Sequence, residues 1–166
     1  FFKQKTACEI PKRDWSSDVC SSDLCEPGEV VVTGGGTESD NLAVKGIARA
    51  ARDAGAPDGV VVSAIEHRAV LGAADRLARE GARVALAPVT GAGVVDLDRL
   101  EDLLDEAVAV VSVMTVNNEV GTRQPIEDIA AIVRDRAPRA RLHTDAVQAC
   151  SWVTADAYAA ADLVAV

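Results

Sequence analysis

The sequence predicts an α/β fold: a mainly parallel sheet with helices on both faces. Short runs of Val, Ala and Leu alternate along the chain with longer stretches in which apolar residues recur at helical spacing. The short runs are apolar at nearly every position, which is typical of strands that are covered on both faces. Aromatic residues make up only 3% of a chain that is 49% hydrophobic, so small aliphatic side chains must fill the core. A length of 166 residues suits one such domain.

The expected strands and helices follow one another in order along the chain. Strands are predicted at residues 30–33, 60–63, 84–87, 108–114, 142–144 and 163–166. Helices are predicted near residues 37–54, 69–80, 97–104 and 126–133. Asp96 suits the N-cap of the third helix, and Pro125 suits the first position of the fourth. Alternation of this kind gives right-handed crossovers between parallel strands.

Residues 1–24 differ in composition from the rest of the chain. They contain both Phe residues and one of the two Trp residues, and they show no sustained period. They resemble a translated sequencing adapter, so we leave them out of the fold prediction as a segment that is not native. The alternative is a genuine disordered N-terminal arm. The domain is expected within residues 25–166.

Charge and cysteine usage exclude several classes of protein. The formal net charge is −9, which argues against a nucleic-acid partner. The longest apolar run is too short to cross a bilayer, and we find no signal peptide, so we expect no membrane association and a cytoplasmic protein. The four cysteines form no CxxC pair and do not cluster with either histidine, which predicts reduced thiols and no metal site.

Ligands of parallel sheets bind at the carboxyl ends of the strands, so the residues that follow each run are the candidates. The first run is followed by Gly34, Gly35, Gly36 and Thr37 at the start of a helix. Backbone N–H groups, the helix dipole and the Thr37 hydroxyl would together favour a phosphate. The loop matches neither common nucleotide fingerprint, and a plain strand-to-helix turn is the alternative.

Two further runs are followed by an imidazole and by amides. His67 could stack on a ligand or transfer a proton, but it could also simply begin a helix. Ser63 and Glu66 have the spacing of a capping box, which would be structural. Asn117 and Asn118 could hydrogen-bond a ligand without adding charge, or they could form a turn.

A carboxyl group and another amide follow the run at 142–144. Burying Asp145 as an ion requires a cation or strong donors, and a protonated pyridine nitrogen is one such cation. The alternative is an N-cap for a following helix. Gln148 lies three residues further on, whereas His143 lies inside the run and is expected to pack without a functional role. Together, the candidates predict one ligand site at one edge of the sheet.

Four stretches resemble the cysteine desulfurases of the iron–sulfur cluster and nitrogenase-maturation type. These enzymes belong to the class V aminotransferase superfamily, with pyridoxal 5'-phosphate (PLP) fold type I. The resemblance runs from about Val30 to the end of the chain. It is carried by TGGGTESDNLAVKG at 33–46, EHRAVL at 66–71, VMTVNNEVG at 113–121 and HTDAVQA at 143–149. The fold it implies is part of the large PLP-binding domain.

The resemblance implies a role for each matched residue. Gly36 and Thr37 would hold the PLP phosphate, and His67 would stack on the pyridine ring and take part in acid–base steps. Asn118 would lie beside the ring near its phenolic oxygen. Asp145 would pair with the pyridinium nitrogen, which keeps the ring an electron sink.

The last assigned residue is Gln148, which would hydrogen-bond the phenolic oxygen. The resemblance further implies conversion of L-cysteine to L-alanine, with sulfur passed to an enzyme cysteine as a persulfide. It implies a homodimer and a sulfur acceptor such as a cluster scaffold. The family's Schiff-base lysine, nucleophilic cysteine and substrate-binding arginine are expected beyond Val166, so this chain is expected to be an inactive fragment. Cys150 is expected to be a small core residue.

Three other hypotheses stay open from the sequence. Another PLP enzyme of class V is one, although TESDNLA and NNEVG argue against it. A nucleotide-binding α/β module is the second, and it requires an acidic residue after the second strand to bind a ribose, for which Glu66 could be mistaken. A non-catalytic interaction domain is the third, and it would require a large exposed apolar patch.

Overall fold

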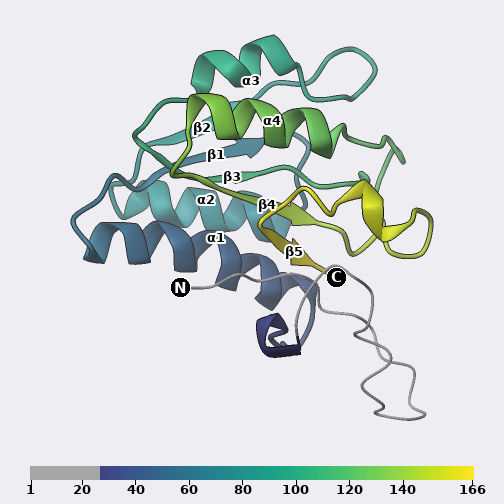
Figure 1. The fold of residues 1–166 in the computed structure, drawn as a ribbon, viewed down its shortest axis with the longest axis horizontal. Helices are drawn as coiled ribbons and strands as arrows, with labels where there is room; N and C mark the ends of the chain where they lie inside the picture. The colour runs from purple at the N-terminus through teal and green to yellow at the C-terminus, as the bar shows by residue number, and fades with distance from the viewer. Residues whose placement is uncertain (1–26) are drawn as a thin grey trace.

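The computed structural model describes residues 27–166, which form a sheet of five parallel strands (Figure 1). The order across the sheet is β2-β1-β3-β4-β5. The strands are β1 (Gly59–Ser63), β2 (Val84–Ala87), β3 (Val108–Ser112), β4 (Arg141–Asp145) and β5 (Leu163–Ala165). The segment 1–24, predicted to be non-native, lies outside the described residues.

The strand register explains why β1 and β3 are almost entirely apolar. Val61 of β1 pairs with Ala85 of β2 on one side and with Val111 of β3 on the other. Every residue of β1 and of β3 is buried, as the unbroken apolar runs predict for strands covered on both faces. At Gly59 a Cβ atom would come within 2.4 Å of the Ala107 carbonyl oxygen, so only glycine allows this approach.

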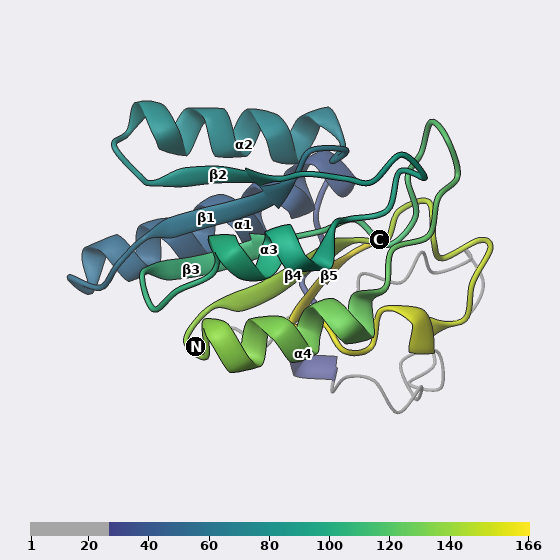
Figure 2. The ribbon, with the colours of Figure 1, turned by 90° about the horizontal axis from the view of Figure 1, so that it is seen from above.

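Two helices cover each face of the sheet, as predicted. Figures 1 and 2 show α1 (Gly36–Asp53) and α2 (Arg68–Arg79) on one face, and α3 (Leu97–Leu103) and α4 (Ile126–Arg136) on the other. Two hydrophobic clusters fill the layers between helices and sheet. Short 3-10 turns are formed by Pro27–Glu29 and Ala155–Ala157.

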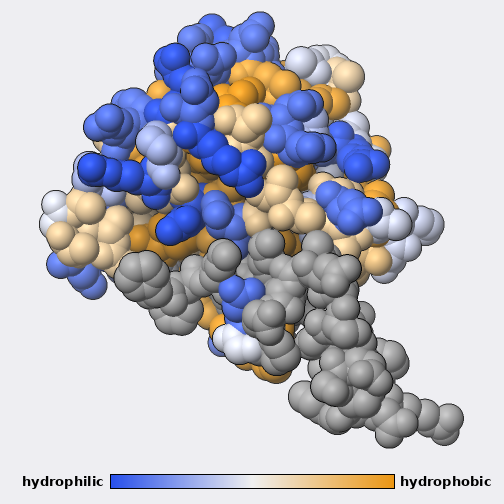
Figure 3. Space-filling model, viewed as in Figure 1, coloured by the Kyte–Doolittle hydropathy of each residue, from blue (hydrophilic) through white to orange (hydrophobic). Residues whose placement is uncertain are grey.

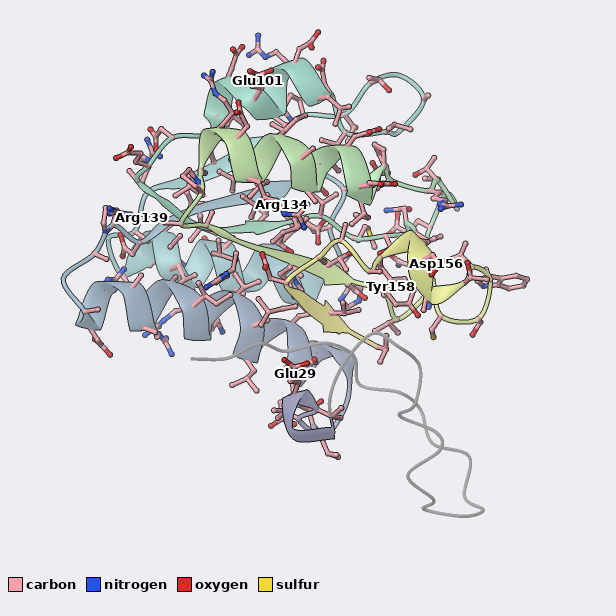
Figure 4. All side chains as sticks on the ribbon, in the orientation of Figure 1. Glu29, Glu101, Arg134, Arg139, Asp156 and Tyr158 are labelled. Atoms are coloured by element: carbon pink, nitrogen blue, oxygen red, sulfur yellow. The ribbon has the colours of Figure 1, made fainter. Side chains whose placement is uncertain are left out.

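Residues next to the helix N-termini determine where the helices begin. The Asp96 carboxylate accepts a hydrogen bond from the N–H of Arg99 at 3.2 Å, which confirms it as the N-cap of α3. Pro125 lies at the N-cap of α4, one position before the one predicted. Arg134 of α4 donates to the carbonyl of Ala160 at 2.9 Å and so ties the segment before β5 to this helix (Figure 4).

The predicted strand at 30–33 is wrong. These residues belong to no strand or helix, and the side chain of Val32 is 80% exposed. Three consecutive valines favour an extended chain, but a strand also needs a neighbour for its N–H and C=O groups. No described strand pairs with this segment, so the glycine-rich turn is reached from irregular chain.

The surface of the described residues carries mainly polar side chains over the helices. Figure 3 shows hydrophilic side chains gathered over α3, with a smaller apolar area just below them. None of the helices within residues 27–166 combines the length and the apolar character that a bilayer-spanning helix needs.

Candidate functional site

The strand order creates a natural binding position at the carboxyl edge of the sheet. After β1 the chain turns to β2 on one side, whereas the connections after β3 lead to β4 and β5 on the other. The loops that follow β1 and β3 therefore diverge, and this switch point is where open α/β sheets bind ligands. The first turn of α1 reaches the same edge, because a Cβ at Gly36 would lie only 2.7 Å from Cγ2 of Val147, just after β4.

Three titratable side chains meet at this edge. Asp40 from α1, His67 after β1 and Asp145 at the end of β4 each offer a ligand atom within 4.8 Å of the others. His67 is the N-cap of α2, and its Nδ1 accepts a hydrogen bond from the N–H of Ala69 at 3.2 Å. A neutral ring with an acceptor at Nδ1 carries its proton on Nε2. The structure thus brings together His67 and Asp145, two of the predicted site residues.

The two carboxyl groups lie in a buried setting that favours a cation. Burial raises the pKa of Asp145, while the N–H of Val147 at 2.9 Å and the charge of His67 lower it. Burial and the nearby Asp145 raise the pKa of Asp40 to about 8. No lysine or arginine within residues 27–166 forms an ion pair with either group. A small cation with an N–H donor, such as a pyridinium, therefore fits this position.

The start of α1 offers free backbone donors. Gly35 has φ 149°, which favours glycine, and α1 has no side-chain cap. The N–H of Gly34 already donates to the Glu38 carboxylate at 2.6 Å. By contrast, the N–H groups of Gly36 and Thr37 have no acceptor among residues 27–166. These two donors point to an anion site at the helix N-terminus, next to the turn that carries Val147.

The two neighbouring asparagines have different surroundings. Asn117 is buried: its Nδ2 donates to the carbonyl of Ile65 at 2.9 Å, and its Oδ1 accepts the N–H groups of Glu119 and Val120. Asn118 is exposed. Asn117 thus fastens the loop after β3 to the loop that carries His67.

Asn118 and Gln148 line a common hollow of about 510 Å³. Val120 and Trp152, two exposed apolar side chains, also line it. Neither His67 nor Asp145 does, so this hollow lies beside the charged cluster and not around it. The predicted site residues thus fall into two groups at one edge of the sheet, and Thr37 lies exposed on the first turn of α1.

The capping-box interpretation of Ser63 and Glu66 is wrong. Glu66 lies before the helix and turns inward, where its Oε1 accepts the Ser63 hydroxyl at 2.6 Å and the N–H of Met114 at 2.7 Å. Its Oε2 accepts the Ser112 hydroxyl at 3.4 Å. Burial raises the pKa of Glu66 to about 8, against the lowering effect of the Ser63 and Met114 donors. Because both oxygens are occupied inside the protein, Glu66 is not available to a ribose.

Two other expectations differ from the structure. Turns occupy residues 147–152 and no helix begins directly after Asp145, so Asp145 is not a helix N-cap. Cys150 is exposed, not in the core, and its thiol donates to the carbonyl of Val147 at 3.3 Å. The turns direct Cys150 outward, while Ala149 fills the interior position.

Sequence reasoning missed Asp40 and the inward role of Glu66, and it did not foresee that Asn117 connects two loops. Asp40 follows Thr37 by three positions, which places both on one side of the first turns of α1. Polar residues inside the predicted strands were a further indication of buried polar contacts, since Ser112 and His143 are fully buried. The expectation that His143 packs inside the protein is confirmed.

Comparisons with known proteins give one consistent result. Residues 25–163 match the sequence model of the class-V aminotransferase family. Over 131 residues, or 79% of this chain, the identity is 41% with the mitochondrial cysteine desulfurase of Drosophila melanogaster and 43% with the cysteine desulfurase IscS of Methanosarcina thermophila. The match spans 28% and 31% of those two relatives, respectively.

A solved structure resembles the fold as well. The crystal structure of DndA from Streptomyces lividans shares 33% identity with this chain, at a TM-score of 0.72. The likeness covers 80% of this chain and 36% of DndA.

Proposed function

Because this chain belongs to the class-V aminotransferase family, we propose that it is the part of a PLP-dependent cysteine desulfurase that binds the ring and phosphate of the cofactor. The family is enzymatic and depends on PLP, and the likeness to DndA confirms the predicted fold class, a partial large domain of PLP fold type I. The single observation that carries the proposal is the buried Asp145 beside His67, without a lysine or arginine partner in the described residues.

The donor set fits PLP in charge and in chemistry. The Asp145 carboxylate would hold the protonated ring nitrogen by a charge-assisted hydrogen bond. When bound, a protonated pyridine ring supplies an electron sink for the substrate's reacting carbon. His67 would cover one face of the ring, with its Nε2 proton directed to the site and able to move in acid–base steps.

The remaining groups would fix the two polar ends of the cofactor. The N–H groups of Gly36 and Thr37 and the Thr37 hydroxyl would bind the phosphate. Asn118, in the loop after β3, and Gln148, in the turn after β4, both line the hollow and would donate to the phenolic oxygen.

The activity of the whole protein is part of the same proposal. It would take sulfur from L-cysteine, leave L-alanine and carry the sulfur as a cysteine persulfide to an acceptor protein such as a cluster scaffold. Residues 25–166 would form part of the large domain of a cytoplasmic homodimer that serves iron–sulfur cluster or thio-cofactor assembly.

Titration of this chain with PLP, followed by tryptophan fluorescence, tests the proposal. We expect saturable binding that Asp145→Asn weakens by about 10-fold or more, because a charge-assisted hydrogen bond is lost. Asp135→Asn, on the exposed side of α4, is the matched control and should leave binding unchanged. EDTA is present throughout, since Asp40, His67 and Asp145 could also bind a divalent cation. A folded chain that binds NAD but not PLP would refute the proposal.

A further inference from the structure

A row of buried polar groups leads from the site into the sheet. Asp40 Oδ1 lies 3.6 Å from Nε2 of His143, and Nδ1 of the same ring lies 2.9 Å from the Ser112 hydroxyl. The Ser112 hydroxyl in turn faces Glu66 Oε2 at 3.4 Å. Asp40 and His143 are 1% and 0% exposed, respectively, so water does not compete for these groups. The outer end of the row is Asp145, whose carboxylate lies within 4.8 Å of that of Asp40.

Two atoms of this row have no hydrogen-bond partner: Oδ1 of Asp40 and Nε2 of His143. They face each other, and a single proton between them would satisfy both after a small shift. Burial lowers the pKa of His143 to about 4, so the imidazole is neutral and carries a single N–H proton. The position of that N–H decides which partner supplies the proton between Asp40 and His143.

The hydrogen bonds at the inner end of the row indicate where the ring proton lies. Ser112 has one hydroxyl proton, and donating it to Glu66 leaves its oxygen free to accept from Nδ1 of His143. Nε2 is then an acceptor, which requires Asp40 to be the donor. Burial raises the pKa of Glu66, but this carboxyl group already accepts two short hydrogen bonds, from Ser63 and Met114, and these favour its ionised form. Asp40 Oδ1 accepts none.

We propose that Asp40 is a positioning residue of the cofactor site: it holds the proton that it and Asp145 share, in a hydrogen bond to His143, so that Asp145 presents the one negative charge to the ring nitrogen. This inference rests on the proposed function. Asp40 does not touch the ring; it acts through Asp145, because two neighbouring buried carboxyl groups do not both ionise readily.

The groups around Asp40 agree with this assignment. The loop after β1 contributes Glu66 and His67, and β4 contributes His143 and Asp145. The adjoining residues of β5 are aliphatic. Asp40 therefore faces two carboxyl groups, Glu66 and Asp145, and two imidazoles, of which burial keeps His143 neutral. Burial and Asp145 raise the pKa of Asp40 to about 8, in the direction that the geometry requires.

Two substitutions separate the proton from the shape of the side chain. Asp40→Asn keeps an N–H donor for His143 and can never be charged, whereas Asp40→Leu removes the donor. At pH 6.5 we expect Asp40→Asn to bind PLP within about twofold of the unmodified chain and Asp40→Leu to bind about 10-fold more weakly. At pH 9 the unmodified chain gains a second negative charge, so its affinity should exceed that of Asp40→Asn by about threefold or more.

Carboxyl ¹³C NMR of the chain without PLP gives an independent readout. The Asp40 signal, assigned by its loss in Asp40→Asn, should report a protonated carboxyl at pH 7. An Asp40 signal that titrates together with the exposed aspartates, or a proton found on Glu66 instead, overturns the inference. So does equal weakening of PLP binding by Asn and Leu at pH 6.5. If no variant or unmodified chain binds PLP, the proposed function fails, while the NMR titration still decides whether Asp40 holds the proton.

Discussion

Oε1 of Glu66 accepts a hydrogen bond from the backbone N–H of Met114 at 2.7 Å, across 48 positions of sequence. The bond joins the loop after β1 to the residues just after β3, and these two strands are neighbours inside the sheet. Glu66 directly precedes His67, so its attachment to Met114 also fixes where the imidazole begins α2. A buried carboxyl group thus positions a neighbouring side chain that faces the site.

Removing the Glu66 carboxyl group should destabilise the protein. Glu66→Leu leaves the buried N–H of Met114 without a partner, together with the hydroxyls of Ser63 and Ser112, and should cost about 2 to 4 kcal/mol. Glu66→Gln keeps the oxygen that accepts from Met114 and can donate to Ser112, so it should cost less than about 1 kcal/mol at pH 6.5. Urea unfolding followed by circular dichroism measures both values. Equal losses for Gln and Leu would contradict the assigned contacts.

Stability should fall as the pH rises from 6.5 to 8. Burial raises the pKa of Asp40 from its ordinary value of 3.8 to about 8 in the folded chain. The stabilisation from a protonated carboxyl is complete below its unfolded pKa and is lost as the pH rises through its folded pKa. Each proton contributes at most about 1.4 kcal/mol per pH unit.

His143 does not disturb this pH window. Burial lowers its pKa from 6.5 to about 4, so its contribution is present above pH 6.5 and is lost only as the pH falls toward 4. Asp40→Asn should therefore flatten the pH dependence of stability between pH 6.5 and 8. Thermal unfolding across this range checks the slope, and a protein that becomes more stable toward pH 8 would contradict the prediction.

The helices and most strands could be predicted because their signals are local. The spacing of Leu97, Leu100 and Leu104 after Asp96 indicates a helix and its start without reference to the rest of the chain. The run at 30–33 shows the limit, since a strand depends on a neighbour that the local sequence does not specify.

Only the site residues that lie at or after the end of a strand could be predicted. His67 and Asp145 follow strands, so the rule for parallel sheets places them at one edge. Glu66 has a misleading local spacing to Ser63, while the partner that fixes its inward direction lies on β3. The pairing of Asp40 with His143 depends on how α1 lies against β4, which no local pattern encodes.

Gly36→Ala tests the close contact between α1 and the turn after β4. The new Cβ would lie 2.7 Å from Cγ2 of Val147, so we expect a loss of about 1 to 3 kcal/mol in stability and weaker PLP binding. Val147→Ala removes that carbon, and the double variant should regain most of the loss. Gly46→Ala, in the same helix but with open space around it, is the control and should stabilise by up to about 1 kcal/mol. Additive effects of Gly36→Ala and Val147→Ala would mean that the two residues do not touch.

Asn117 and Asn118 should separate stability from ligand binding. Asn117→Ala removes the hydrogen bond to Ile65 and the acceptor for Glu119 and Val120, which should cost about 1 to 2 kcal/mol. Asn118→Ala changes an exposed side chain, so the free energy of unfolding should stay within about 0.5 kcal/mol.

For PLP binding we expect the opposite ranking, with a direct effect of Asn118→Ala and only an indirect effect of Asn117→Ala. Asn118→Ala removes a direct donor to the cofactor and should weaken binding by about fivefold without altering the folded state. Asn117→Ala should weaken binding only as far as the loop that it holds becomes mobile, so low temperature or a stabilising osmolyte should restore its affinity but not that of Asn118→Ala. Fluorescence titrations at two temperatures distinguish the two cases. If Asn118→Ala destabilised the chain while Asn117→Ala did not, the side chain that points into the protein would have been assigned to the wrong asparagine.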